Sequence, residues 1–279
     1  YHRPRLSLVR GHRYRVSYLV RAEPARELVV AFYRPGATFT HLGGPPGCFE
    51  EQVRLAAGVG VDLISFPVPM PWPEPGREED WSAAETACRN VLRENPKALL
   101  LPRLGMDPPS WWREANPEDV MTWEDGSTQR GAAVASPIYR RDAAARLAAL
   151  VSHLEQTLGE HIAGYHPCGQ NTGEWFYHLT WGRTLSGYSP AETRAWREWL
   201  RARYGDDRAL RAAWGRPDAA LASAELPTPA ARRATPHGVL RHVRHERPLL
   251  DFAQFQQEAM ADCVIELAAA ARQASAGRK

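Results

Sequence analysis

Residues 61–105 read VDLISFPVPMPWPEPGREEDWSAAETACRNVLRENPKALLLPRLG, and this stretch decides the fold. It contains two short apolar runs, at 61–69 and 97–105, on either side of an amphipathic segment near residues 83–94. Short apolar runs that alternate with amphipathic helices are typical of a parallel sheet with helical crossovers. The stretch therefore predicts one β/α unit followed by the strand of the next unit.

The same alternation continues on both sides of this stretch. A strand is predicted at 37–42 and a helix near 49–57 before it, and a helix near 142–158 and a strand at 161–166 after it. Four strands in this order predict a parallel α/β fold. In that class ligands bind at the carboxyl ends of the strands, where each loop departs.

The C-terminal part predicts two further helical segments joined by an irregular one. Ser189 and Pro190 open a helix within 189–214 as its cap and first-turn residue. Residues 217–248 are rich in Pro, Ala and Arg without a clear period, which predicts a long excursion over the surface. From residue 251 an apolar stripe at helical spacing predicts a final helix that covers the sheet. The members of this stripe are Phe252, Phe255, Ala259, Met260, Cys263, Val264 and Leu267.

Residues 1–36 have a different pattern. Tyr14, Val16, Tyr18 and Val20 alternate with polar residues, and a second apolar run comes after a Glu-Pro turn. Alternation of this kind predicts a pair of antiparallel strands. Two strands alone are marginally stable, so this β-ribbon is interpreted as the tail of a β-sandwich or as an edge ribbon on the α/β part of the chain.

Composition limits the class of protein. The chain has 279 residues, of which 44% are hydrophobic and 24% charged, with a formal net charge of +3. These values predict a soluble globular protein with one large α/β domain or two smaller ones. No basic tract indicates nucleic-acid binding, and no run of 18 apolar residues indicates a membrane span. Compartment and oligomeric state are left open.

The four cysteines indicate neither a metal site nor a disulfide framework. Cys48, Cys88, Cys168 and Cys263 are far apart and form no CxxC spacing. Free buried thiols are therefore predicted, and the sequence predicts no metal and no cofactor.

Unusual polar and aromatic residues come after three of the predicted strands, in the segments PVPMPWPEPG, RLGMDPPSWW and PCGQNTGEWFY. Because parallel strands end at one edge of the sheet, these residues are predicted to share one rim. Indole faces bind sugar rings, and amides bind sugar hydroxyls. For each tryptophan the alternative is a loop anchor, and for Arg103 it is an ion pair with Asp107 or Glu174. The predicted substrate-binding residues are Trp72, Arg103, Trp111, His166, Gln170, Asn171 and Trp175.

The order of several motifs resembles the retaining β-glycosidases built on the (β/α)8 barrel, and most of all the family 42 β-galactosidases. From about residue 47 to 279 the motifs are PWPEPG, NPKALLLPRLGMDPPSWW, NPEDV with a following DG, SPIYR, WREWLRARYG with LRAAW, and DFAQF. The resemblance implies a TIM-type barrel over residues 37–279, truncated to about its first four β/α units. It also makes residues 1–36 similar to the last strands of a carbohydrate-binding sandwich.

The resemblance implies hydrolysis of terminal β-glycosidic bonds, with Glu174 as the general acid and base after the fourth strand. The family has an Asn directly followed by the acid, whereas Asn171 stands three residues before Glu174. Counting along the strand from Gly164 instead places Gln170 in that position. Glu174 is preferred, because Gln cannot donate and reclaim a proton. The turn GQNTGE can fold the carboxylate back over the strand end, and it is similar to the turn that holds the acid in β-amylases.

Two expectations concern Glu174 and the extent of the chain. Burial beside Trp175 and Phe176 would favour the protonated form of Glu174, as a general acid requires; the alternative is a surface carboxylate that caps a helix starting near Trp175. The nucleophile of a retaining enzyme is expected on the seventh strand, beyond Lys279, so the chain is expected to be a fragment that is inactive alone. The alternative function is a non-catalytic carbohydrate-binding protein on a degenerate glycosidase barrel.

Overall fold

The computed structural model describes residues 48–178, 184–238 and 240–279, together with residues 9, 11–15, 17 and 19. The ribbon predicted over 1–36 and the strand predicted at 37–42 fall outside these ranges, apart from the isolated residues just named. Both stay predictions.

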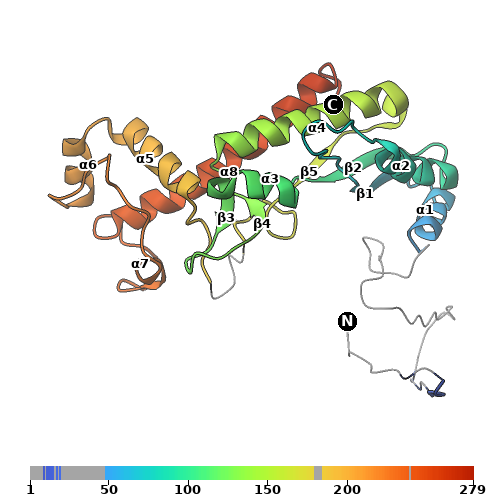
Figure 1. The fold of residues 1–279 in the computed structure, drawn as a ribbon. Helices are drawn as coiled ribbons and strands as arrows, with labels where there is room; N and C mark the ends of the chain where they lie inside the picture. Colours follow the sequence, from blue (N-terminus) through green and yellow to red (C-terminus); the bar gives the residue numbers. More distant parts are fainter. Residues whose placement is uncertain are drawn as a thin grey trace.

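Three parallel strands form the central sheet of the described chain (Figure 1). They are β1 (Leu63–Val68), β2 (Leu99–Gly105) and β5 (His166–Cys168), with β2 between the other two. In β1 and β2 every second side chain is buried, so that Ile64 and Leu100 face the core while Leu63 and Leu99 are exposed. One face of the sheet is therefore covered and the other is open.

Helices cover the buried face. α1 (Cys48–Gly58) and α2 (Ser82–Glu94) pack together, and α2 also packs on β1. α4 (Pro137–Leu158) runs side by side with the second half of α8 (Arg247–Ala274) (Figure 1). The prediction that the final helix covers the sheet is correct only in part, because α8 packs mainly on α4 and reaches the sheet at β5.

The predicted elements of this half are confirmed with three differences. α4 begins at Pro137, earlier than expected, because the Ser136 hydroxyl caps it by accepting a hydrogen bond from the backbone N–H of Tyr139. β5 begins at His166, where the predicted strand ended; Ile162 forms only an isolated bridge with Leu100. Arg103 lies within β2, whereas the sequence places it just after the strand.

The crossover between β2 and α4 carries short elements that the sequence did not predict. α3 (Ser110–Ala115) and the 3-10 turn η1 (Pro117–Asp119) lead into an antiparallel ribbon. Its strands are β3 (Val120–Thr122) and β4 (Thr128–Ala132). A second 3-10 turn, η2 (Gly159–His161), joins α4 to β5. The ribbon lies at the carboxyl end of the sheet, beside the residues that come after β5 (Figure 1).

A helical lobe forms the other end of the molecule (Figure 1). It contains α5 (Pro190–Tyr204), α6 (Asp207–Trp214) and the short α7 (Pro229–Arg233). The irregular excursion predicted over residues 217–248 is found at 217–228, but α7 then interrupts it and α8 begins before its end, at Arg247. Ser189 caps α5 with Pro190 in its first turn, as predicted. α5 ends where Gly205 adopts a φ of 76°, which a glycine tolerates.

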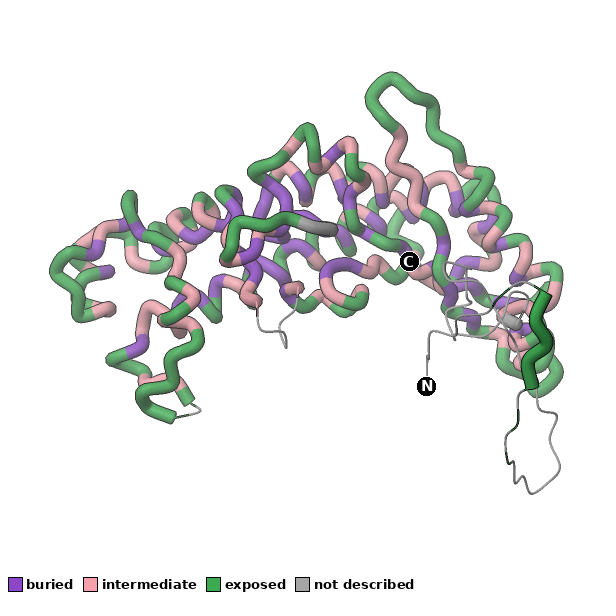
Figure 2. The backbone as a smooth tube through the Cα atoms, turned by 60° about the horizontal axis from the view of Figure 1, so that its bottom comes forward, coloured by how far each residue is buried: buried purple, intermediate pink, exposed green. Residues whose placement is uncertain are grey.

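Two hydrophobic cores share α8. Buried residues occur at both ends of the molecule and between them (Figure 2). The lobe core surrounds Trp196, which is fully buried, and receives Phe252 and Phe255 from the first half of α8. The sheet core receives Cys263 and Leu267 from the second half. Burial raises the pKa of the Cys263 thiol to about 12, and that of Cys88 in α2 likewise, so both behave as apolar core residues.

Candidate functional site

Backbone hydrogen bonds hold together the turn after β5, residues 169–178. The backbone N–H of Glu174 donates to the carbonyl of Asn171 at 3.1 Å, and that of Trp175 donates to Gly169 at 3.1 Å. Asn171 also forms an antiparallel bridge with Phe176. Such tight reversal uses left-handed backbone at three residues that are not glycine, Gln170, Thr172 and Trp175. Strain of this kind is maintained only where the surroundings fix it, and it is concentrated at functional sites.

Trp175 fixes the turn over the end of β5. Its indole N–H donates to the carbonyl of Pro167 at 3.0 Å. Its ring lies directly over Gly169, so close that a Cβ on Gly169 would be 2.7 Å from Cη2 of the indole. The sequence predicts that the GQNTGE turn folds back over the strand end, and the turn has this form.

Glu174 lies at the tip of this turn and is exposed. One carboxylate oxygen accepts a hydrogen bond of 2.7 Å from the Thr172 hydroxyl. The burial expected beside Trp175 and Phe176 is not found in the described chain. The alternative, a cap of a helix at Trp175, is wrong, because residues 172–175 form turns and Trp175 has a φ of 58°.

The two amides of the turn are less exposed than Glu174. Gln170 is buried and donates from Nε2 to the carbonyl of Ala132 at 3.0 Å, which ties the turn to β4. Oε1 of Gln170 and Nδ2 of Asn171 are buried and find no hydrogen-bond partner among the described residues. Buried polar atoms of this kind are rare in proteins and call for a water or a ligand.

Arg103 and His166 lie side by side on neighbouring strands, opposite each other in the register of β2 and β5. Both stand on the open face of the sheet. Partial burial, and the positive charge of Arg103, lower the pKa of His166, so that its imidazole is neutral at pH 7. The pair therefore offers one permanent cation and one neutral donor–acceptor group.

His178, at the end of the turn, meets Asp107 from the loop after β2. A Cβ on Gly131 would lie 2.8 Å from Nε2 of His178 and 3.8 Å from Oδ1 of Asp107. Burial lowers the pKa of His178, and the negative charge of Asp107 opposes that shift. Nε2 of His178 is buried without a hydrogen-bond partner among the described residues.

Tyr177 joins the turn to α5. Its hydroxyl lies 3.3 and 3.4 Å from the two carboxyl oxygens of Glu192, and both side chains are buried. Burial raises the pKa of Glu192 to about 7, against the opposing effects of Tyr177, Arg140 and Arg232. Glu192 is thus a carboxyl group that is partly protonated at neutral pH.

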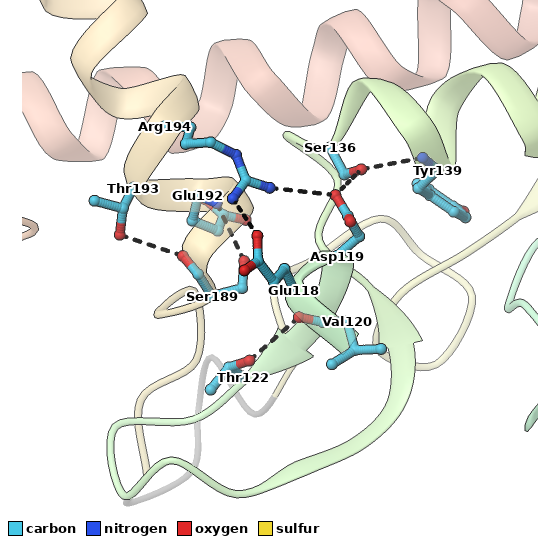
Figure 3. Close-up of polar contacts among 10 residues, drawn as sticks. All are labelled: Glu118, Asp119, Val120, Thr122, Ser136, Tyr139, Ser189, Glu192, Thr193 and Arg194. Carbon is cyan, nitrogen blue, oxygen red and sulfur yellow. Dashed lines mark hydrogen bonds and ion pairs between the residues drawn. The ribbon is translucent and has the colours of Figure 1, made fainter. Parts of the chain in front are cut away.

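A polar junction fixes the start of α5, where Glu192 lies (Figure 3). The Ser189 hydroxyl accepts a hydrogen bond of 3.1 Å from the backbone N–H of Glu192. Arg194 forms ion pairs with Glu118 at 2.6 Å and with the buried Asp119 at 3.7 Å. Because Ser136 donates to Asp119, the starts of α4 and α5 are joined through η1.

Trp72 and Trp111 line a cleft that is separate from the turn 169–178. The Trp111 indole donates to the carbonyl of Trp72 at 3.2 Å, and the Trp72 ring meets Trp112 edge-on with centroids 6.4 Å apart. The three indoles line a cleft of about 390 Å³ together with Asp142 and Arg146 of α4. None of the residues that line it comes from the turn 169–178. The predicted rim is therefore divided between this cleft and the turn.

A family model described as beta-galactosidase, glycoside hydrolase family 42, matches residues 49–278 of the chain. The chain belongs to this family. It is similar to beta-galactosidase BgaA of Thermus sp, with 30% identity over 179 residues that cover 61% of the chain and 26% of the relative. The chain thus spans about a quarter of the length of that curated relative.

Solved structures show the same fold. The beta-galactosidase of the psychrophilic Marinomonas ef1 superposes with a TM-score of 0.61 at 19% identity, over 84% of this chain and 34% of that one. The catalytic domain of a beta-amylase from Paenibacillus polymyxa gives 0.65 at 19% identity, over 82% of this chain and 59% of that one. The fold of this family 42 chain is thus α/β of the (β/α)8 type, with part of the barrel sheet present.

Several candidate residues of this family 42 chain were missed by sequence reasoning. The sequence indicates Asp107 only as an ion-pair partner of Arg103, and it predicts no functional role for His178 or Gln256. Glu192 was concealed by its spacing from Ser189, which is that of a capping box whose acid usually lies at the surface. Gln256 had a signal, because it stands four residues from both Phe252 and Met260 in an otherwise apolar stripe.

Metal ligation and membrane insertion have no structural support in the described part of the chain. Within the described ranges, no three His, Cys, Asp or Glu side chains are grouped so that they could hold a metal ion. Over the same residues, no helix combines the length and the apolar character needed to cross a bilayer.

Proposed function

We propose that this chain forms the part of a retaining β-galactosidase-like glycosidase that carries the general acid and base, and that Glu174 is that group. One observation supports the proposal most. The turn 169–178 folds back over β5 and presents the Glu174 carboxylate, exposed, at the carboxyl edge of the sheet. In barrels of this class catalytic groups lie at this edge.

The chemistry needs a carboxylic acid that protonates the leaving oxygen and then, as a carboxylate, activates water. The exposed position of Glu174 allows both exchanges of a proton. Thr172 holds one carboxylate oxygen, so the group is oriented while the other oxygen stays available for substrate. In the full enzyme a bound sugar would itself exclude water from Glu174, and that would supply the desolvation that the turn does not.

Substrate contacts are proposed for the residues nearest this carboxylate. Gln170 and Asn171 each have a buried polar atom that a sugar hydroxyl could satisfy, directly or through a water. Arg103 and His166 stand beside the turn on the open face of the sheet. Trp72 and Trp111 line their own cleft, so we propose for them a contact with a more distant part of the glycoside.

Replacement of Glu174 tests the proposal in the full-length enzyme that it requires. Glu174→Gln should lower kcat by about 10²–10⁴-fold on alkyl glycosides, and far less on aryl glycosides with acidic phenols, which need no protonation. Glu160→Gln is the control, because that exposed carboxylate lies before β5 at the opposite end of the sheet. Unchanged hydrolysis of both substrate types by Glu174→Gln, with loss of activity in Gln170→Ala, would show that the acid was assigned to the wrong residue.

A second function has one observation in its favour. Direct counting along the strand puts Gln170 at the acid position, and this side chain is buried and bonded to Ala132. A chain whose acid has become a structural amide would bind carbohydrate without cleaving it. Sugar binding together with activity that is insensitive to every carboxylate of the turn would favour this alternative.

A further inference from the structure

A small cavity lies between the turn and α8. Its volume is about 170 Å³. The four residues directly after Glu174, namely Trp175, Phe176, Tyr177 and His178, form one side of it. Gln256 and Met260 of α8 form the opposite side, and Ser186 and Arg232 lie between them. The cavity thus starts one residue away from the proposed catalytic carboxylate.

Two of the lining side chains have buried polar atoms without a hydrogen-bond partner in the described part of the chain. Nε2 of His178 and Nε2 of Gln256 are both buried, and neither has a hydrogen-bond partner among the described residues. An unpaired buried polar group costs about 1–3 kcal/mol. Two such groups among the residues that line a single cavity are explained most simply by a polar occupant.

Two glycines leave the space that the side chains of Gln256 and His178 occupy. A Cβ on Gly187 would lie 2.7 Å from Nε2 of Gln256 and 3.3 Å from the Tyr177 ring. A Cβ on Gly131 would lie 2.8 Å from Nε2 of His178. Both glycines have a positive φ, 88° and 92°, which favours glycine at these positions in addition to the lack of space.

The remaining walls fit a sugar rather than an ion or an apolar ligand. Trp175 and Tyr177 offer aromatic surface, which suits the apolar face of a pyranose. Arg232 donates to the carbonyl of Ser186 at 2.9 Å and lies 5.1 Å from the Phe252 ring centroid, so its charge already has partners. At about 30 Å³ per water, the cavity has the volume of roughly six waters, enough for one sugar ring and too little for two.

We propose that this cavity binds a single pyranose ring of the glycoside, with Gln256 and His178 bonding its hydroxyls and Trp175 stacking on its apolar face. This inference rests on the proposed function, because it names a sugar site next to Glu174. Terminal rotation of a Gln amide or a His ring is soft, so both nitrogens can turn toward the ligand. The site is built from the turn and from α8, and it shares no residue with the cleft at Trp72.

Calorimetric titration of the 279-residue chain with methyl β-D-galactopyranoside tests the site. Gln256→Leu keeps the bulk of the side chain and removes the amide, and it should weaken binding at least ~10-fold, the loss expected for one buried hydrogen bond. Gly187→Ala should weaken binding similarly, because it displaces Gln256. Gln254→Leu, on the exposed side of the same helix, is the control and should bind as the unaltered chain does.

Thermal melting separates loss of the site from loss of the fold, since Gln256→Leu should keep the Tm of the unaltered chain. Binding that survives Gln256→Leu and Gly187→Ala would overturn the assignment, as would a chain that binds no pyranoside at millimolar concentration. Glu174-dependent hydrolysis with an indifferent Gln256 would refute the cavity alone, and binding without Glu174-dependent hydrolysis would refute the proposed function alone.

Discussion

Two aromatic clusters stand at the same edge of the sheet, and they differ in backbone conformation and in how many of their polar atoms are satisfied. In the first, which we call the anchor cluster (Trp72, Trp111 and Trp112), the indoles of Trp111 and Trp112 donate to Trp72 and Asp142, and Nε1 of Trp72 is buried without a partner among the described residues. In the turn 169–178, polar atoms of Gln170, Asn171 and His178 are buried without partners in the described chain, and the backbone is left-handed at three non-glycine residues. Several unpaired polar groups combined with strained backbone therefore indicate a site better than aromatic residues do.

The largest expected difference between the clusters is in stability. Trp112 is fully buried, whereas Trp175 is only half-buried. Trp112→Ala should lower the free energy of unfolding by about 3–5 kcal/mol, because it leaves a large cavity, and Trp175→Ala should lower it by clearly less. Denaturant titration followed by circular dichroism measures both. Equal losses would mean that the turn is as much a packing anchor as the first cluster.

An effect of intermediate size is expected from Glu192, which holds the turn through Tyr177: it should make the free energy of unfolding depend on pH. Its folded pKa of about 7 lies above its unfolded value of 4.5, so the folded state binds the proton more tightly. Stability from this group is complete below pH 4.5 and is lost as the pH rises through 7, by about 3 kcal/mol in total. The lowered pKa of His178 acts in the opposite direction, costing stability as the pH falls below 6.5.

Thermal melts between pH 4.5 and 8 isolate the contribution of Glu192 by comparison. Glu192→Gln cannot titrate, so the difference in stability between it and the unaltered chain should change by the amount given above across this range. Glu198→Gln, exposed on the same helix, should leave the profile unchanged. A Glu192→Gln profile parallel to that of the unaltered chain would show that Glu192 titrates equally in the folded and unfolded states.

The smallest expected effect is that of one methyl group under Trp175. Gly169→Ala would place its Cβ 2.7 Å from the indole ring, so the ring and the turn must shift. A cost of about 1–3 kcal/mol is expected for such overpacking, with weaker sugar binding at the adjacent cavity. Gly164→Ala is the matched control before β5, where a Cβ would meet only Leu101 at 3.5 Å. If both variants melt alike, the turn has more freedom than its packing indicates.

Local periodicity predicted the elements of the sheet half well, and for a clear reason. β1, β2, α1 and α2 are each encoded by consecutive residues whose burial follows one period. β5 was placed too early, because the apolar residues before it suggested a strand, whereas the pairing with β2 begins only at His166. The β3–β4 ribbon is polar and short, and its pairing depends on contacts that no local pattern carries.

The site was predicted in part only. The GQNTGE pattern correctly indicated a turn that folds back over the strand, but the exposure of Glu174 depends on how the left-handed residues set its direction. Trp72 and Trp111 were correctly placed at strand ends, yet their cleft opens beside α4, which only the three-dimensional packing decides. Glu192 gains its raised pKa from being enclosed by segments distant in sequence.

The division of α8 between two cores sets a limit on how the chain can change length. Ala259 belongs to the lobe core and Met260 to the sheet core, so the change from one core to the other occurs between neighbouring residues. One inserted residue at this point would turn everything beyond it by about 100° about the helix axis. Either Phe252 and Phe255 or Cys263 and Leu267 would then face solvent. Because one continuous helix packs in both cores, an insertion in a loop such as residues 217–228 should be tolerated better than one within α8.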